Sequence, residues 1–206
     1  MKEFYQDIVV QKSWQTLISL KKSIEFVLIG GWAVYLYTKA LKSKDIDMIV
    51  DYSQLQKLRK DFPIFKNDRL KKYEVKTEGI DIDIYLPHYS DLGVEVEEII
   101  KNKQTKDAFN VPAKEMLVLT KLYAYNARRA SVKGQKDKID IISLVFMEDF
   151  DFSYFQRITG QYQKRGFKEL LINILTETRE VKELNLNKHF FAKKKKGILE
   201  SRITKN

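Results

Sequence analysis

The spacing of hydrophobic residues changes along the chain and predicts a mixed first half. Residues 3–22 carry apolar side chains at helical intervals, which predicts an amphipathic helix. Short apolar runs at residues 25–29 and 46–50 predict two strands, and segment 32–41 between them is apolar enough to predict a well-buried helix. The first quarter of the chain is therefore expected to run helix, strand, helix, strand.

The next part of the chain predicts a second pair of strands. Residues 70–76 and 80–86 have strand character on either side of Glu78-Gly79, so a β-hairpin is expected there. Two short helices are expected beside these strands, at residues 54–60, with Ser53 as the N-cap and Pro63 closing the helix, and at residues 95–103.

From residue 113 onward the pattern is helical. Pro112 suits the first helical position, where its missing N–H is tolerated, and it marks the expected domain boundary. We expect an α/β domain at residues 1–111, with a small mixed β-sheet flanked by helices, and a helical C-terminal domain with a basic tail at residues 112–206. The expected helices of this second domain lie at residues 113–130, 136–146, 153–163 and 164–184.

Two glycines and two aspartates lie beside the first two predicted strands. Gly30-Gly31 ends the first strand, and Asp45 and Asp47 open the second. Alternate residues of a strand share a face, so both carboxylates point the same way, and Mg²⁺ usually takes one or two carboxylates together with substrate phosphates. The glycines let backbone N–H groups and a helix N-terminus approach an anion. Together these features indicate phosphoryl or nucleotidyl transfer.

This arrangement resembles the nucleotidyltransferase superfamily that includes DNA polymerase β-like enzymes. The signature of the superfamily is Gly-Gly or Gly-Ser, a spacer, and Asp-x-Asp on the next strand, which Gly30, Gly31, Asp45 and Asp47 match across spacer residues 32–44. The chain looks most like the AbiEii group, the enzyme half of type IV toxin–antitoxin systems. The resemblance implies the nucleotidyltransferase fold, Mg²⁺ (or Mn²⁺) on the two aspartates, and an NTP whose phosphates lie against the two glycines.

A third carboxylate is expected on the strand at residues 80–86. Isoleucine and aspartate alternate there, so Asp81 and Asp83 share one face and alternation does not choose between them. Superfamily members usually carry a third catalytic or metal-binding carboxylate on a neighbouring strand, and we favour Asp83 because the Asp-Ile-Tyr-Leu-Pro that it opens resembles the end of that strand. The alternative is a solvent-facing edge strand protected by acidic residues.

Two helices of the second half carry a further charged pattern. Lys121 and Arg128 share a helix face, and Lys136, Asp137 and Asp140 open the next helix, with both aspartates expected on the face opposite the apolar residues. The AbiEii group has a similar Lys followed by Lys-Asp-x-x-Asp. The resemblance implies that Lys121 is catalytic and holds nucleotide phosphates, that Asp137 lies near it, and that Arg128 and Lys136 are secondary phosphate contacts. Ordinary surface ion pairs are the alternative.

Charge and composition limit the partners, the metal sites and the cellular location that can be expected. The net charge is +10, and residues 186–206 carry seven Lys or Arg against one Glu, which suits tRNA or other RNA, with a solvated terminus as the alternative. The absence of cysteine excludes disulfides, and two histidines argue against a zinc site. Without a long apolar run or a signal-like N-terminus, a cytoplasmic protein with no membrane contact is expected.

The expected function is therefore transfer of an NMP from an NTP to an acceptor, tRNA or a protein hydroxyl, by a Mg²⁺-dependent nucleotidyltransferase of EC 2.7.7 type. A toxin role with a cognate antitoxin protein is what the AbiEii resemblance implies. Two alternatives stay open: a small-molecule, antibiotic-type nucleotidyltransferase, and a catalytically inactive nucleotide- or RNA-binding module.

Overall fold

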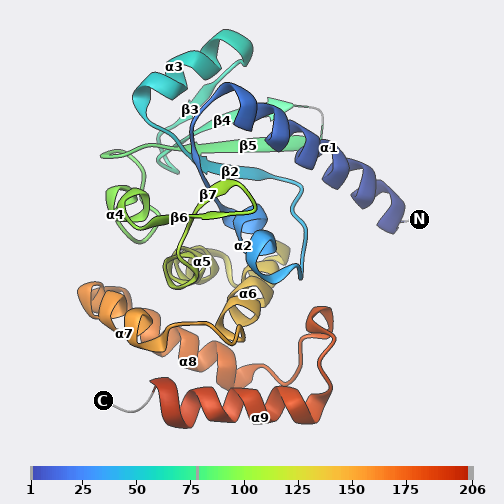
Figure 1. Cartoon of the computed structure of the whole chain (residues 1–206), viewed down its shortest axis with the longest axis vertical. Coiled ribbons are helices and arrows are strands. Elements are labelled where there is room, and N and C mark those ends of the chain that lie inside the picture. The colour runs from blue at the N-terminus through green and yellow to red at the C-terminus, as the bar shows by residue number, and fades with distance from the viewer. Residues whose placement is uncertain (1, 78, 204–206) are drawn as a thin grey trace. The chain divides into compact units, whose positions relative to one another are not determined.

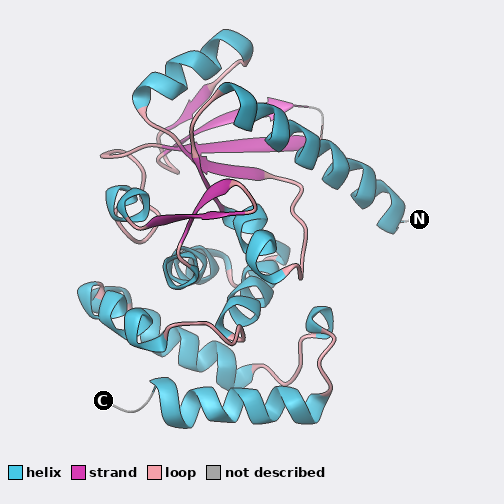
Figure 2. Ribbon diagram, in the orientation of Figure 1, coloured by secondary structure: helices cyan, strands magenta, loops and turns pink. Residues whose placement is uncertain are grey.

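The chain divides into two compact units. The computed structural model describes residues 2–77 and 79–203, and the units meet between Ala113 and Lys114, close to the expected boundary. The first unit combines a five-stranded sheet with helices and a separate two-stranded hairpin, and the described part of the second unit is helical (Figures 1 and 2). The expected class, a small mixed sheet flanked by helices and followed by a helical region, is confirmed.

The sheet of the first unit has the strand order β1-β2-β5-β4-β3. β2 and β5 pair parallel, and the other neighbours pair antiparallel. β5 has a partner on each side, so the idea that its acidic residues protect an exposed edge is wrong. The strands are β1 Val27–Ile29, β2 Ile46–Ile49, β3 Phe65–Asn67, β4 Lys72–Thr77 and β5 Ile80–Tyr85.

The two faces of the sheet differ because the sequence of β5 alternates. Ile80, Ile82 and Ile84 are at most 2% exposed and belong to the hydrophobic core. Asp81 and Asp83 point to the other face and are half-buried. The isoleucine face of β5 is therefore packed into the core, while Asp81 and Asp83 on its other face keep partial exposure.

Aromatic side chains tie the helices of this unit together. The indole Nε1 of Trp32 donates a buried hydrogen bond to Ser13 Oγ at 2.9 Å, which joins α2 to α1. The Trp14 ring lies 5.0 Å from that of Trp32 and 5.9 Å from that of Phe109, so the hairpin joins the same cluster. The helices are α1 Lys2–Ser23, α2 Gly30–Thr38, α3 Tyr52–Asp61 and α4 Val96–Lys101.

Several expected boundaries in this unit are wrong. The N-cap of α3 is Asp51, whose carboxylate accepts the Gln54 N–H at 2.8 Å, and Ser53 only donates to that same carboxylate. Pro112 ends a strand rather than opening a helix. It belongs to a hairpin that was not expected, β6 Lys103–Lys106 and β7 Phe109–Pro112, whose turn uses left-handed backbone at Asp107 and Ala108.

The second unit packs its helices around a core of large apolar side chains, among which Phe155, Leu171 and Phe191 are at most 1% exposed. α6 begins earlier than expected because Ser131 caps it by accepting the Gly134 N–H at 3.0 Å. The helices are α5 Lys114–Arg128, α6 Val132–Val145, α7 Phe152–Gln161, α8 Phe167–Glu177 and α9 Lys188–Ile198, with short helical turns at Gln163–Arg165, Lys182–Leu184 and Leu199–Ile203.

The basic segment near the C-terminus is part of this core rather than a frayed end. It forms α9, whose Phe191 and Ile198 side chains are buried. Lys195 Nζ donates to the Thr178 carbonyl oxygen at 3.0 Å, beyond the last turn of α8. Among the described residues, no helix is both long enough and apolar enough to cross a membrane.

Candidate active site

Two of the expected carboxylates lie beside each other on the face of the sheet opposite the core isoleucines of β5. Asp47 of β2 and Asp83 of β5 are direct partners in the parallel pair, so their side chains leave the same face on neighbouring strands. Asp81 is instead the partner of Lys76 on β4. Strand pairing thus makes Asp83, and not Asp81, the aspartate beside Asp47, and its role as the third carboxylate stays a prediction.

The start of α2 lies directly against the Asp47 side chain. Gly30 has φ +64°, and a Cβ placed on it would stand 2.1 Å from Asp47 Oδ2. Only glycine allows this close approach and this left-handed backbone together. Ile29, at the N-cap of α2, offers no side-chain acceptor, so the first N–H groups of the helix receive no cap from it.

Lys72 partly neutralises the charges of Asp83 and Glu74. Lys72 Nζ lies 2.6 Å from Asp83 Oδ2 and 2.9 Å from Glu74 Oε1, and the Lys72 side chain is only 12% exposed. Burial alone would lower the pKa of Lys72, but its contacts with Asp83 and Glu74 outweigh this and raise it. The hydrogen bond from Lys72 lowers the pKa of Glu74. Lys72 is therefore charged and shared between two carboxylates.

Asp83 has the perturbed titration that an active-site carboxyl often shows. Burial, and then the negative charge of Asp47, raise the pKa of Asp83 to about 6 against the opposing effect of Lys72. The charge of Asp47 can act in this way because the two residues are register partners. A cation between the two carboxylates would remove their mutual repulsion.

The donor set suits a magnesium ion that also takes phosphate oxygens and water, because Mg²⁺ needs only one or two protein carboxylates. Asp47 and Asp83 supply two such groups on one face. Asp45 lies in a bend before β2. In the part of the chain that the structure describes, no three or more His, Asp or Glu side chains gather closely enough to hold a metal by themselves, so Asp45 is not gathered with the pair.

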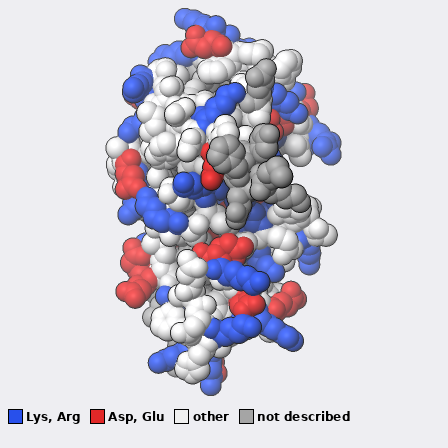
Figure 3. Space-filling model, turned by 90° about the vertical axis from the view of Figure 1, so that its right-hand side faces the viewer, with Lys and Arg blue, Asp and Glu red and all other residues white. Residues whose placement is uncertain are grey.

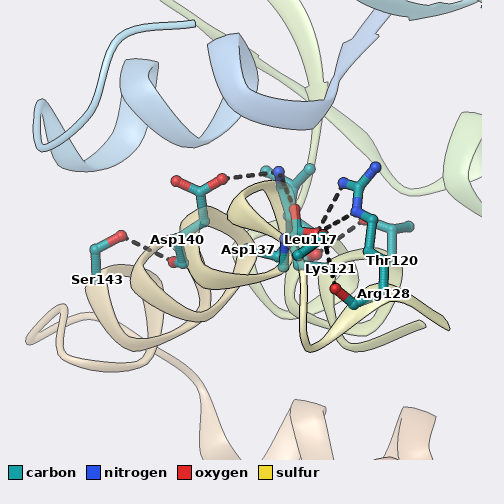
Figure 4. Close-up of polar contacts among 9 residues, drawn as sticks. Leu117, Thr120, Lys121, Arg128, Asp137, Asp140 and Ser143 are labelled. Atoms are coloured by element: carbon teal, nitrogen blue, oxygen red, sulfur yellow. Dashed lines mark hydrogen bonds and ion pairs between the residues drawn. The ribbon is translucent and has the colours of Figure 1, made fainter. Parts of the chain in front are cut away.

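The second charged pattern forms a buried cluster in the helical unit (Figure 4). Lys121 Nζ lies 3.1 Å from Asp137 Oδ1 and 2.7 Å from Asp140 Oδ2. Arg128 Nε donates to the other oxygen of Asp137, Oδ2, at 2.8 Å, and Arg128 Nη2 forms an ion pair with the same oxygen at 2.7 Å. The cluster thus balances two cations against two anions and connects α5 to α6.

Burial separates this cluster from an ordinary surface network. Asp137 and Asp140 are each 1% exposed and Lys121 is 7% exposed, so the face of α6 that carries the aspartates is covered rather than open to solvent. Burial raises the pKa of Asp140, and the charge of Lys121 opposes this. The Asp140 contact with Lys121 is an ion pair without hydrogen-bond geometry, since Oδ2 of Asp140 makes no hydrogen bond. Lys136, expected as a phosphate contact, is half-buried on α6.

Sequence reasoning did not find Lys72 and Glu74. Lys72 and Glu74 are alternate residues of β4, so they share a face of the strand. Only the pairing of Glu74 with Asp83 shows that this face also carries the two aspartates. Over the face shown in Figure 3, lysine and arginine side chains are spread with acidic side chains between them, and no large area has a single sign.

No protein-family model matches the chain, and no curated protein matches it by sequence. Among solved structures it is similar to JHP933 from Helicobacter pylori, with 15% identity, 90% of this chain and 88% of that chain covered, and TM-score 0.46. A candidate nucleotidyltransferase from H. pylori gives 16% identity, 92% and 91% coverage and TM-score 0.47. An antigenic nucleotidyltransferase-like protein from Paracoccidioides brasiliensis gives 17% identity, with 80% of this chain and 90% of that chain covered, and a TM-score of 0.37. Because these TM-scores lie below 0.5, the function proposed below rests on the residues of this chain.

Proposed function

We propose that this protein is a nucleotidyltransferase that moves an NMP from an NTP to an acceptor hydroxyl. The observation that carries the proposal is the register pair of Asp47 and Asp83, with the backbone of Gly30 pressed against Asp47. This arrangement offers two carboxylates and a glycine-bounded helix start on one sheet face, which suits binding of a metal-complexed triphosphate.

Each part of the site has a task in this reaction. Asp47 would hold Mg²⁺ or Mn²⁺, which when bound neutralises charge on the triphosphate, and Asp83 beside it would be either a second ligand or the base. Asp45, which the motif resemblance adds as a ligand, lies outside the Asp47–Asp83 pair and would join it only if the bend before β2 shifted. Gly30 and Gly31 give the phosphates access to N–H groups at the start of α2, which has nine residues and an apolar N-cap.

Asp83 is suited to accept the proton of the acceptor hydroxyl. Without a metal, Asp83 has a pKa raised to about 6, so its carboxyl group is ionised at neutral pH and is a stronger base than an ordinary aspartate. A cation bound to Asp83 would lower this pKa, so the base role belongs to a site whose metal lies on Asp47. As the proton passes to Asp83, the acceptor oxygen forms a bond to the α-phosphorus, and the bond to pyrophosphate breaks. Lys72 keeps the Asp83 carboxylate oriented until the acceptor arrives.

The finer parts of the proposal rest on the motif resemblance. The acceptor is tRNA or a protein hydroxyl, and the role is that of an AbiEii-type toxin countered by an antitoxin protein. Lys121 belongs to the proposal as a nucleotide-phosphate contact only if phosphate replaces one of its two carboxylate partners, because the side chain is otherwise occupied by them. Its contacts favour a positioning role within the helical unit.

The test is incubation of the protein with Mg²⁺, bulk tRNA and each α-³²P-labelled NTP, followed by a denaturing gel. Label on RNA or on protein that is lost in Asp47→Asn and retained in Asp61→Asn, an exposed aspartate of the same unit, supports the proposal. Label that survives Asp47→Asn overturns it. Absence of label with every NTP, together with no thermal stabilisation by Mg²⁺ and nucleotide, also overturns it.

A further inference from the structure

Lys72 lies between two carboxylates rather than in a simple ion pair. Its Nζ is 2.6 Å from Asp83 Oδ2 and 2.9 Å from Glu74 Oε1. Glu74 and Asp83 are register partners on β4 and β5, so one ammonium group reaches both from their shared face. Lys72 can therefore give up its contact with Asp83 and still keep an anionic partner.

A second polar contact holds Glu74 in place. Asn67 Nδ2 donates to Glu74 Oε1 at 3.1 Å, and Asn67 Oδ1 accepts the Leu70 N–H at 3.0 Å. The amide of Asn67 is thus oriented by the backbone of the turn that follows β3, and it contacts the same Glu74 oxygen as Lys72 does. The position of Glu74 therefore does not depend on Lys72 alone.

The charges of these side chains are not balanced. Asp47, Asp83 and Glu74 are successive register partners across β2, β5 and β4, and Lys72 contacts the last two. Three carboxylates and one ammonium group leave an excess of two negative charges, which one divalent cation would balance. If Glu74 were neutral, the excess would be a single charge, and Lys72 would be left with Asp83.

We propose that Glu74 is a positioning residue that sets, through Lys72, how strongly Asp83 binds a divalent cation. A cation that reaches Asp83 competes with Lys72 for the same carboxylate, and Glu74 stabilises the lysine once that contact is lost. Without Glu74, separating Lys72 from Asp83 would leave a largely covered ammonium group without an anion, which is costly. The inference rests on the proposed function, in the arrangement in which Asp83 is a metal ligand.

The test measures divalent binding without NTP, so it is independent of catalysis. Mn²⁺, which takes the same oxygen ligands as Mg²⁺, is titrated into each protein at neutral pH, and the free ion is measured by electron paramagnetic resonance. Glu74→Gln keeps the shape of the side chain and removes its charge, and it is expected to bind Mn²⁺ about tenfold more weakly than wild type.

Asp81→Asn is the matched control. It also removes a carboxylate from this face of the sheet, but the register partner of Asp81 is Lys76 rather than Glu74. Its charge acts on the Asp47–Asp83 pair only through a screened field, so Mn²⁺ affinity should stay within about threefold of wild type.

A double-mutant cycle shows whether Glu74 acts through Lys72. Lys72→Met removes the competing cation and is expected to bind Mn²⁺ about tenfold more tightly than wild type. In that background Glu74→Gln should change the affinity by about threefold or less, because the lysine that it positions is gone. Circular dichroism checks that each variant is folded. If Lys72→Met is not, the comparison of Glu74→Gln with Asp81→Asn decides.

The outcomes separate this inference from the function on which it rests. Equal Mn²⁺ affinity of wild type and Glu74→Gln overturns the inference, and so does an equal loss in Glu74→Gln and Asp81→Asn. An effect of Glu74→Gln that is the same with and without Lys72 also overturns it, because that is a simple effect of charge. If Glu74→Gln lowers the affinity while Asp47→Asn leaves it unaltered, the role of Glu74 stands and the fault lies in the proposed nucleotide site. No Mn²⁺ binding by any of these proteins overturns both.

Discussion

Gly30 and Asp47 are so close that they exclude any side chain at position 30. A Cβ there would stand 2.1 Å from Oδ2 and 2.6 Å from Cγ of Asp47. The turn after β1 and the first aspartate of the register pair are therefore a single structural unit: a change in one displaces the other. This contact explains in physical terms why glycine stands at position 30 when Asp47 follows on the next strand.

Substitution of Gly30 by alanine is expected to remove nucleotide-dependent stabilisation and to cost about 1–3 kcal/mol in the free energy of unfolding. The methyl group would meet the Asp47 carboxyl, and the backbone, with φ +64°, is unfavourable for alanine. Urea unfolding, with and without Mg²⁺ and NTP, measures both effects. Gly160→Ala is the control, because its Cβ would meet nothing within 4 Å and it lies in a helix, where alanine is favoured. Equal behaviour of the two variants would contradict the prediction.

Asp83 should make the protein less stable as the pH rises. Its pKa is about 6 in the folded protein, against 3.8 for an ordinary aspartate, so the folded state binds this proton more tightly than the unfolded state. The stability that results is complete below about pH 4 and is lost as the pH rises through 6. A shift of about two pH units corresponds to about 3 kcal/mol.

Asp83→Asn keeps this side chain neutral at every pH. Its free energy of unfolding relative to wild type is therefore expected to rise by up to about 3 kcal/mol between pH 4 and pH 7, measured by urea unfolding in EDTA. Asp68→Asn is the control of opposite sign, because the hydrogen bond from Lys66 lowers the pKa of Asp68. A pH-independent difference between Asp83→Asn and wild type would refute the prediction.

Replacement of Lys121 by methionine is expected to destabilise the protein by about 3–5 kcal/mol, because it leaves Asp137 and Asp140 buried with one cation between them. Arg128→Met should cost about 1 kcal/mol, since its side chain is 42% exposed and Lys121 still pairs with Asp137. Asp140→Asn in the Lys121→Met background should recover part of the loss. A stable Lys121→Met protein that fails only to bind nucleotide would instead favour the phosphate-binding role.

The basic C-terminal segment should not be tested by deletion, because it carries core residues. Phe191→Ala is expected to cost about 3–5 kcal/mol, whereas Phe190→Ala, at a position 48% exposed, should change stability by about 0.5 kcal/mol or less. Chemical denaturation of the two variants gives the comparison. Similar losses would mean that α9 contributes no core.

RNA contact by this segment is better tested with exposed charges. Lys193→Gln combined with Lys196→Gln removes two exposed cations from α9 and leaves its buried face intact. If RNA binds there, the slope of log affinity against log salt should become shallower by about 1–2, because each phosphate contact that is lost reduces the number of counterions released on binding. An unchanged slope across a salt series would exclude the segment from the RNA interface.

The parts of the fold that were predictable are those with a strong local period. The alternating isoleucines of β5 and the helical spacing of α8 both have one face that must be buried, so each was expected from its own residues. β3, β6 and β7 were missed because they are short, and β3 and β6 are mostly exposed, so their side chains show no clear apolar face.

The residues of the candidate site could be predicted from the sequence, but not which of them lie side by side. Asp47 and the candidates Asp81 and Asp83 followed from spacing, but the pairing of Asp47 with Asp83 is set by strand register between distant segments. For Asp137 and Asp140 the helical spacing showed that they share a face, and it could not show that α5 covers this face with Lys121. Such facts depend on which element packs beside which, and no single segment encodes that.

The position of Lys72 would make the proposed metal binding an exchange between cations. Its ammonium group already contacts Asp83 and Glu74, so a divalent ion that reaches Asp83 must displace a charge that belongs to the chain itself. The sheet holds Asp83 and Glu74 together through Lys72, and entry of the proposed metal would free this lysine to turn to Glu74 alone or to an incoming phosphate. The occupancy of the proposed site would then be tied to the position of one side chain on β4.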